Sequence, residues 1–318
     1  MRRHDAIVLL CLLAACVLLV LGYVFIGLDA ENWDYNFPRR VKIVLAIIVV
    51  GAAIGLSAVT FQTVTANQIL TPSIIGLDSL YLFIQTLVVY TLGSGKLAMM
   101  NDLPSFILTV LLMAGFSAIL FSLMFRKEAS NVYFLVLVGF ICGTVFSGLA
   151  SFMQIIIDPS EFSVLEGRMF ATFNRINVSL MGAAAVVVFA MYLLTVWDYP
   201  VLDVLTLGRS QAINLGVDYR KAVLRTLVAT ALMTSAATVL VGPITFLGIM
   251  AVSLARQLVR TFRHAVLVHA SMMVTTAILL LGMLVTERLF VFSAPLSVIL
   301  NFVGGGYFLM LLVRMRRT

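Results

Sequence analysis

The chain has 318 residues, of which 62% are hydrophobic and 11% are charged, and its mean hydropathy is +1.11. Soluble domains contain roughly 45–50% apolar and about 25% charged residues, so this composition excludes a soluble globular protein and indicates a chain that contacts lipid. The net charge of +7 comes from short basic clusters between apolar runs. That arrangement is typical of orientation in a membrane and argues against binding to nucleic acid.

Long apolar runs follow one another along almost the entire sequence. A membrane-spanning helix needs about 20 apolar residues, and these runs are too long and too evenly apolar for barrel strands. We therefore predict an all-α, polytopic membrane protein with one transmembrane domain over residues 1–318. The ten candidate helices lie near residues 6–28, 41–65, 72–93, 103–125, 131–157, 176–197, 221–241, 244–259, 265–286 and 295–313.

The first apolar run follows the basic segment "MRRHD" and could be read as a signal peptide. It is as long as a full span and has no small-x-small cleavage site before the acidic loop that follows it. We therefore expect a retained first membrane helix.

The basic residues predict the orientation. With a cytoplasmic N-terminus and ten alternating spans, 14 of the 21 lysines and arginines fall on the inner side. This bias predicts that both termini are cytoplasmic. The short eighth candidate, 244–259, is needed for this result, because omitting it would place two basic clusters outside.

Two similar segments interrupt the apolar pattern. "TPSIIG" follows the second candidate helix and "GPITFLG" follows the seventh. The two segments are five helices apart, so they would run in opposite directions through the membrane. Inverted repeats with broken helices at corresponding positions are typical of transporters.

The motifs of this sequence that resemble enzyme sites lack residues that such sites need. The segment "TLGSGKLAMM" contains Gly-Ser-Gly-Lys, but Tyr90 and Leu97 occupy places where a phosphate-binding loop needs a glycine and a hydroxyl. The histidines His4, His264 and His269 are too scattered, and too close to helix ends, for a metal site or a catalytic pair. We therefore predict no catalytic residues, no metal site and no cofactor on this chain. If ATP drives it, the ATP binds to a partner.

Two polar segments and one acid leave alternatives open. Residues 206–225 form either a knob of short helices that fits a groove on another subunit or an amphipathic loop on the lipid headgroups. Residues 158–175 form either a short helix on the outer surface or a solvated loop. Asp78 is the one acid predicted within a span. Such acids usually face a cavity or a partner, but its place near the helix end favours a role in that end.

The segments "NFPRRVKIVLAIIVVGAAIGLSAVTFQTVTANQILTPSIIGLDS" and "LGRSQAINLGVDYRKAVLRTLVATALMTSAATVLVGPITFLGIMAVSLARQLV" resemble the permease subunits of ferric-siderophore and cobalamin ABC importers of the type II class. The resemblance runs from about residue 35 to the C-terminus. It implies an inverted-repeat fold of ten helices with cytoplasmic termini. It also implies several partners: a second permease subunit, identical or paralogous, two cytoplasmic ATPase subunits that bind ATP, and an external substrate-binding protein, periplasmic or lipid-anchored.

The same resemblance assigns roles to residues of this chain. It implies a cytoplasmic gate at Asn67 and Ile69, with a second constriction at Ser130 and Asn131. The segment that couples to the ATPases is implied at Gln211, Ala212, Leu215 and Gly216. Docking of the binding protein is implied at Arg39 and Arg288, with Arg40 compensating for an arginine that Asn36 replaces.

We therefore expect the permease subunit of an ATP-driven importer that moves a ferric siderophore into the cytoplasm by alternating access. The expected location is a bacterial inner (cytoplasmic) membrane. "TPSIIGLDSLY" is most similar to permeases for catecholate-type siderophores. The alternatives are a permease of the same family for cobalamin or haem, and a secondary transporter driven by an ion gradient.

Overall fold

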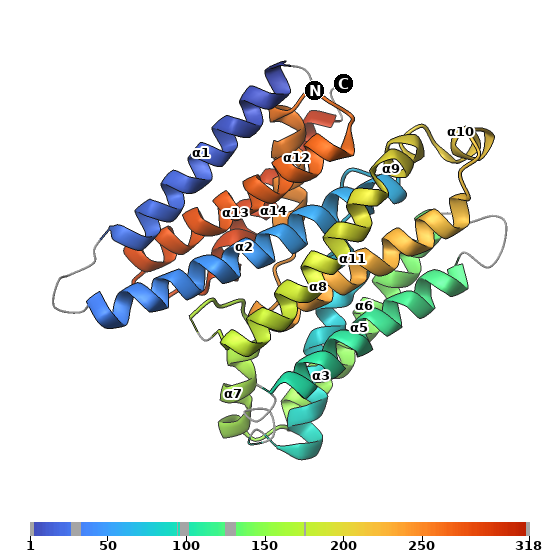
Figure 1. Ribbon diagram of the computed structural model, residues 1–318. Coiled ribbons are helices and arrows are strands. Elements are labelled where there is room, and N and C mark those ends of the chain that lie inside the picture. Colours follow the sequence, from blue (N-terminus) through green and yellow to red (C-terminus); the bar gives the residue numbers. More distant parts are fainter. Residues whose placement is uncertain are drawn as a thin grey trace.

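The computed structural model describes residues 3–26, 33–93, 95, 102–124, 132–174 and 176–315. Within these ranges the protein is all-helical, which confirms the predicted fold class (Figure 1). The helices in chain order are α1 (Arg3–Phe25), α2 (Trp33–Val64), η2 (Pro72–Ile75), α3 (Leu77–Leu92), α5 (Leu103–Met124), α6 (Val132–Ile156), α7 (Pro159–Met169), α8 (Val178–Trp197), α9 (Tyr199–Leu205), α10 (Arg209–Asn214), α11 (Tyr219–Val241), α12 (Leu247–Leu258), α13 (His264–Arg288) and α14 (Leu296–Met315).

Each of the ten predicted apolar segments contains a helix. By length and hydropathy, seven helices of the described ranges could cross a membrane, namely α1, α2, α5, α6, α8, α11 and α13. The apolar helices α3, α12 and α14 are shorter. The number of true spans and the side of the membrane on which the termini lie stay predictions.

Helix α2 begins earlier than its apolar run, at Trp33 rather than near residue 41. Its polar first turns carry aromatic side chains, and the rings of Trp33 and Phe37 stack with centroids 5.1 Å apart. The ring of Phe25, at the end of α1, lies 6.4 Å from each of them. Such aromatic clusters are common where a membrane helix leaves the bilayer, and an apolar-run criterion misses the turns that they occupy.

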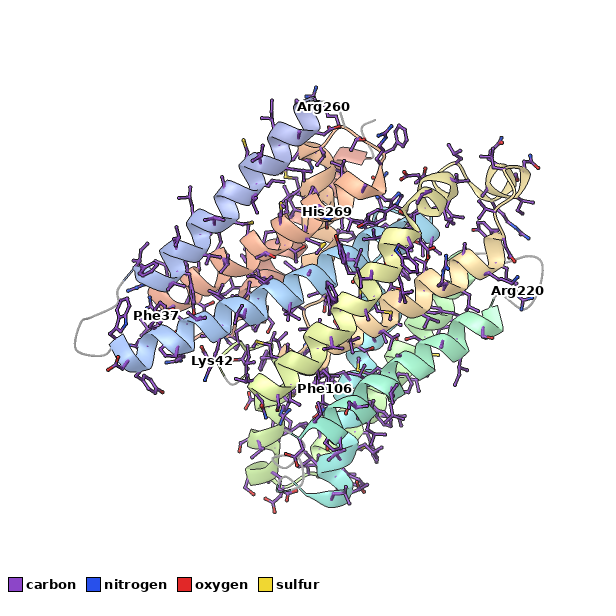
Figure 2. The ribbon with its side chains drawn as sticks, viewed as in Figure 1. Phe37, Lys42, Phe106, Arg220, Arg260 and His269 are labelled. Atoms are coloured by element: carbon purple, nitrogen blue, oxygen red, sulfur yellow. The ribbon has the colours of Figure 1, made fainter. Side chains whose placement is uncertain are left out.

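The bundle has two distinguishable ends. The start of α1, the end of α14 and the short helices α9 and α10 lie at one end, which we call the α10 end, and α7 lies at the other, the α7 end (Figure 1). Arg220 and Arg260 lie at the α10 end, and Phe37 lies at the opposite end (Figure 2). Arg220 and Arg260, which belong to two of the basic clusters that we predict to be cytoplasmic, therefore lie at the same end.

Helix α2 lies at the centre of the bundle. It packs against α13 on one side and α11 on the other. Of the residues in its most apolar stretch 72% are buried, against 17% of those in the corresponding stretch of α1. Gly51 and Gly55 allow the close approach to α13, because a Cβ atom on Gly55 would lie 2.8 Å from the Cα atom of Met272. Small residues four apart are a common way to bring membrane helices together, since close backbones gain van der Waals contact.

The two similar sequence segments both interrupt helices. After α2, a loop and η2 precede α3, and Gly76 between η2 and α3 has a φ of 92°. After α11, Gly242 has a φ of 100°, and α12 begins at Leu247. Each glycine also faces neighbouring backbone: a Cβ atom on Gly76 would lie 2.8 Å from the Cα atom of Gly143, and one on Gly242 would lie 3.0 Å from that of Ala171. Both breaks therefore need glycine for conformation and for space.

Candidate functional site

The predicted gate residues lie in the loop that follows α2. The backbone leaves the helix at Ala66, whose φ is 46°, and the N–H of Asn67 donates to the carbonyl of Gln62 at 3.2 Å. The side-chain oxygen of Asn67 accepts a hydrogen bond from the N–H of Ile69 at 3.0 Å. Asparagine commonly shapes turns by this contact. Asn67 and Ile69 thus belong to one tight turn at the α10 end, and both are half-buried.

The second predicted constriction lies outside the described residues. Ser130 and Asn131 immediately precede α6, whose first residue is Val132. Their role stays a prediction from the family resemblance.

The predicted coupling segment is a helix with defined ends. Gly208, with a φ of 92°, precedes α10, and Gly216, with a φ of 84°, follows it. The N–H of Val217 donates to the carbonyl of Ala212 at 3.0 Å, and the N–H of Gly216 donates to that of Ile213 at 2.9 Å. This pair of bonds is a Schellman motif, in which glycine supplies the left-handed residue.

The surface of α10 is divided between one buried and several exposed side chains. Ala212 is fully buried and faces the bundle, whereas Leu215 is 62% exposed and Gln211 is also exposed. No atom lies within 4 Å of a Cβ built on Gly216. Helix α10 lies beyond the end of α11 (Figure 1). Residues 206–225 thus contain short helices joined at glycines, and the fit of this segment to a groove on another subunit stays a prediction.

Two of the three arginines predicted to bind a partner are exposed at the α1–α2 corner. Arg39 is exposed, and so is Arg288, whose guanidinium donates to the carbonyl of Ile26. Arg40 differs, because its side chain is only 11% exposed and pairs with Glu287 at 2.8 Å. It also donates to the carbonyls of Tyr23 and Ile26, at 2.9 and 2.7 Å.

These contacts correct the interpretation of Arg40. Its guanidinium satisfies carbonyls at the C-terminal end of α1, where a helix leaves acceptors without partners, and neutralises a carboxylate on α13. Arg40 therefore joins α1, α2 and α13, and this internal role replaces the predicted compensation for Asn36. Arg39 and Arg288 remain as docking candidates.

Asp78 joins the two broken helices. It lies in the first turn of α3, is 8% exposed, and accepts a hydrogen bond from the hydroxyl of Thr245 at 3.0 Å. Thr245 belongs to the break between α11 and α12. A carboxylate in the first turn of a helix also interacts favourably with the helix dipole. Asp78 thus lies at a helix end, as favoured from the sequence, and it also forms a polar contact between the two interrupted segments.

Sequence reasoning missed one polar cluster altogether. His264, set aside as a residue near a helix end, is fully buried and contacts Asp203 of α9 and Thr63 of α2. These three residues are far apart in the sequence, and no motif joins them. Only a histidine at the start of an apolar run, with acids elsewhere in the predicted inner loops, could have indicated the cluster.

The long apolar helices, the broken pair and the protruding short helices together define a polytopic membrane transport protein of the permease type. The chain matches the FecCD transport family over residues 6–314 and belongs to this family. It is therefore a transport subunit and not an enzyme, as predicted.

Two relatives are similar along nearly their whole length. The petrobactin import system permease protein YclO of Bacillus subtilis (strain 168) is 47% identical over 323 residues, covering 100% of both chains. The petrobactin import system permease protein FatC of Bacillus anthracis is 31% identical over 318 residues, covering 99% of this chain and 90% of the relative.

A solved structure has the same fold. It is a metal-chelate type ABC transporter in an inward-facing conformation, with a TM-score of 0.84 and 23% sequence identity, covering 97% of this chain and 99% of the other. At this level of identity the likeness establishes the type II importer permease fold that the resemblance implied.

Proposed function

We propose that this chain is the permease subunit of an ATP-driven importer that carries a ferric siderophore across the cytoplasmic membrane. The single observation that carries the proposal is the 47% identity to a petrobactin import permease over the full length of both chains. A siderophore of the petrobactin type, which is a large polar iron chelate, is the substrate class. Membership of the FecCD family replaces the alternative of a secondary transporter driven by an ion gradient.

The partners follow from this role. A second permease subunit would complete the translocation path, two ATPase subunits would bind at the α10 end, and a substrate-binding protein would deliver the chelate at the α7 end. The α10 end is then cytoplasmic, in keeping with its basic residues. ATP binds to the ATPase subunits, and this chain needs no cofactor of its own.

Within the chain, three regions take part in alternating access. The turn at Asn67 and Ile69 serves as a gate at the cytoplasmic side, together with Ser130 and Asn131. Helix α10, with its exposed Gln211 and Leu215, enters a groove on the ATPase. Arg39 and Arg288 pair with acidic residues of the docked binding protein, where exposed charges steer association and set its dependence on salt.

Substrate class is tested by uptake in cells. A strain that lacks its own siderophore permeases would receive this chain with its cognate ATPase and binding protein. The proposal predicts uptake of radioactive iron supplied as ferric petrobactin, and no uptake of cobalamin or haem. Cobalamin or haem uptake without iron-chelate uptake would replace the substrate class and keep the importer.

A further inference from the structure

Three polar side chains from three separate helices meet at the α10 end of the bundle. His264 is the first residue of α13 and has 0% of its surface exposed. Its Nδ1 atom lies 2.6 Å from Oδ1 of Asp203, which is in α9, and its Nε2 atom lies 2.7 Å from the hydroxyl oxygen of Thr63, in the last turn of α2. The imidazole ring thus connects α9 to α2 by one contact on each side.

The contacts fix the orientation of the ring. Oδ1 of Asp203 also accepts the backbone N–H of His264 at 2.8 Å, so the carboxylate both caps α13 and holds Nδ1–H. Nε2 is then directed at Thr63. The Thr63 hydroxyl has a second acceptor, the carbonyl of Val59 at 3.0 Å, within its own helix. Because the ring is fully buried, it cannot reach a substrate, and a catalytic role is excluded.

The two ends of this connection lie beside the two predicted moving parts. On one side, Asp203 belongs to α9, which packs against α2, α13 and α10. On the other side, the carbonyl of Thr63 accepts the N–H of Ala66 at 3.2 Å, where the chain turns out of α2 into the loop that holds Asn67. The cluster therefore connects α9, which packs against α10, to the last turn of α2, which leads into that loop.

We propose that His264 is a positioning residue that makes the gate turn after α2 follow the movement of α9 and α10. The proposal rests on the proposed function, in which α10 contacts the ATPase and the turn at Asn67 is the gate. Apolar helix contacts can slide past one another, whereas loss of the buried contact to Thr63 would leave Nε2 of His264 without a partner. A displacement of Asp203 is thus passed to Thr63 through the rigid imidazole ring.

The test compares variants in the complete importer reconstituted in liposomes, with both permease subunits, the ATPases and the binding protein. The readout is ferric petrobactin moved per ATP hydrolysed. Thr63→Val removes the hydroxyl at nearly constant volume, and Thr63→Ser restores it. His264→Asn keeps a donor for Asp203, and hence the cap of α13, but is too short to reach Thr63. Thr60→Val is the matched control, since the buried Thr60 hydroxyl bonds only to carbonyls of its own helix.

The proposal predicts that Thr63→Val and His264→Asn lower the transport per ATP about ten-fold, a size usual for coupling between two sites, while complexes assemble and still hydrolyse ATP. Thr63→Ser and Thr60→Val should resemble the unmodified chain. The double variant Thr63→Val/His264→Asn should lose no more than either single one, because both remove the same connection.

Two results would overturn the proposed role of His264 while leaving the proposed function intact: unchanged transport per ATP in Thr63→Val, or an equal loss in Thr60→Val. A proportional fall of transport and hydrolysis in Thr63→Val is a case of the first result, because transport per ATP is then unchanged, and it indicates a structural role alone. If the unmodified complex moves no ferric petrobactin with ATP, the proposed function itself fails, and the role of His264 fails with it.

Discussion

The hydroxyl of Thr245 donates a hydrogen bond to the carboxylate of Asp78, at 3.0 Å, where the two broken helices of the bundle meet. Asp78 follows η2 in the first half of the chain, and Thr245 precedes α12 in the second half. The contact therefore joins two segments whose sequences are similar and whose predicted directions through the membrane are opposite.

This contact predicts the effect of Thr245→Val on stability. The valine removes the Thr245 donor from the buried carboxylate of Asp78, and a hydrogen bond to a charged group contributes about 1.5–3 kcal/mol. We expect a lower midpoint of thermal unfolding in detergent, and a midpoint close to that of the unmodified protein for Thr245→Ser. Thr109→Val is the control, because Thr109 bonds only to the carbonyl of Ser105 in its own helix. Equal midpoints for Thr245→Val and the control would contradict the role of this contact.

The close packing of α2 on α13 predicts a second effect. Gly55→Ala introduces a Cβ atom 2.8 Å from the backbone of Met272, so the two helices must separate. Overpacking of this kind typically costs about 1–3 kcal/mol. Gly182→Ala in α8 is the control, because no atom lies within 4 Å of its added Cβ. The midpoint of thermal unfolding in detergent should fall for Gly55→Ala and stay unchanged for Gly182→Ala. Equal midpoints for the two variants would show that the helices do not pack this closely.

Two adjacent arginines predict opposite phenotypes. Arg40→Ala removes the guanidinium that pairs with Glu287 and donates to the last carbonyls of α1, and we expect a loss of about 2 kcal/mol in stability. Arg39→Ala changes an exposed side chain, and we expect a stability change within about 0.5 kcal/mol.

Binding measurements complete this comparison. Affinity of the complex for its substrate-binding protein should fall in Arg39→Glu, and the difference from the unmodified complex should shrink as salt is raised, because exposed charges are screened. A destabilised Arg39→Ala, or an unchanged affinity in Arg39→Glu at low salt, would remove the docking role of Arg39.

The glycine that ends α10 predicts a loss of coupling. Its φ of 84° is unfavourable for other residues by about 1–2 kcal/mol, while the space around it is open. We therefore expect Gly216→Val to preserve the fold and the permease pair but to lower ATP-driven uptake strongly. Gly216→Asn, which tolerates this conformation better, should retain more activity. Normal uptake by Gly216→Val would remove the coupling role of α10.

The sequence predicts those parts of the fold that depend on local composition. Runs of about 20 apolar residues place the long helices, and the Pro-Ser-Ile-Ile-Gly and Gly-Pro segments place the two breaks, because glycine and proline act through their own backbone. The start of α2 was predicted too late, since its first turns are polar and are held by aromatic contacts to α1.

The site is less accessible to sequence reasoning, because it depends on which residues the fold brings together. Arg39 and Arg40 are neighbours in the chain, yet successive side chains of a helix point about 100° apart, so one faces out and the other reaches Glu287. The role proposed for His264 depends on its contacts to Asp203 and Thr63, which lie on other helices. Neither arrangement could be predicted without knowing how α2, α9 and α13 pack.

The central claim, ATP-driven import of an iron chelate, is tested most directly in sealed liposomes that contain the complete complex with its ATPases facing out. The chelate is enclosed with the binding protein, and its release to the ATPase side is measured. We predict release of ferric petrobactin that requires ATP hydrolysis and is unaffected by ionophores. Release that continues without ATP and stops when an ionophore collapses the ion gradient would contradict the account.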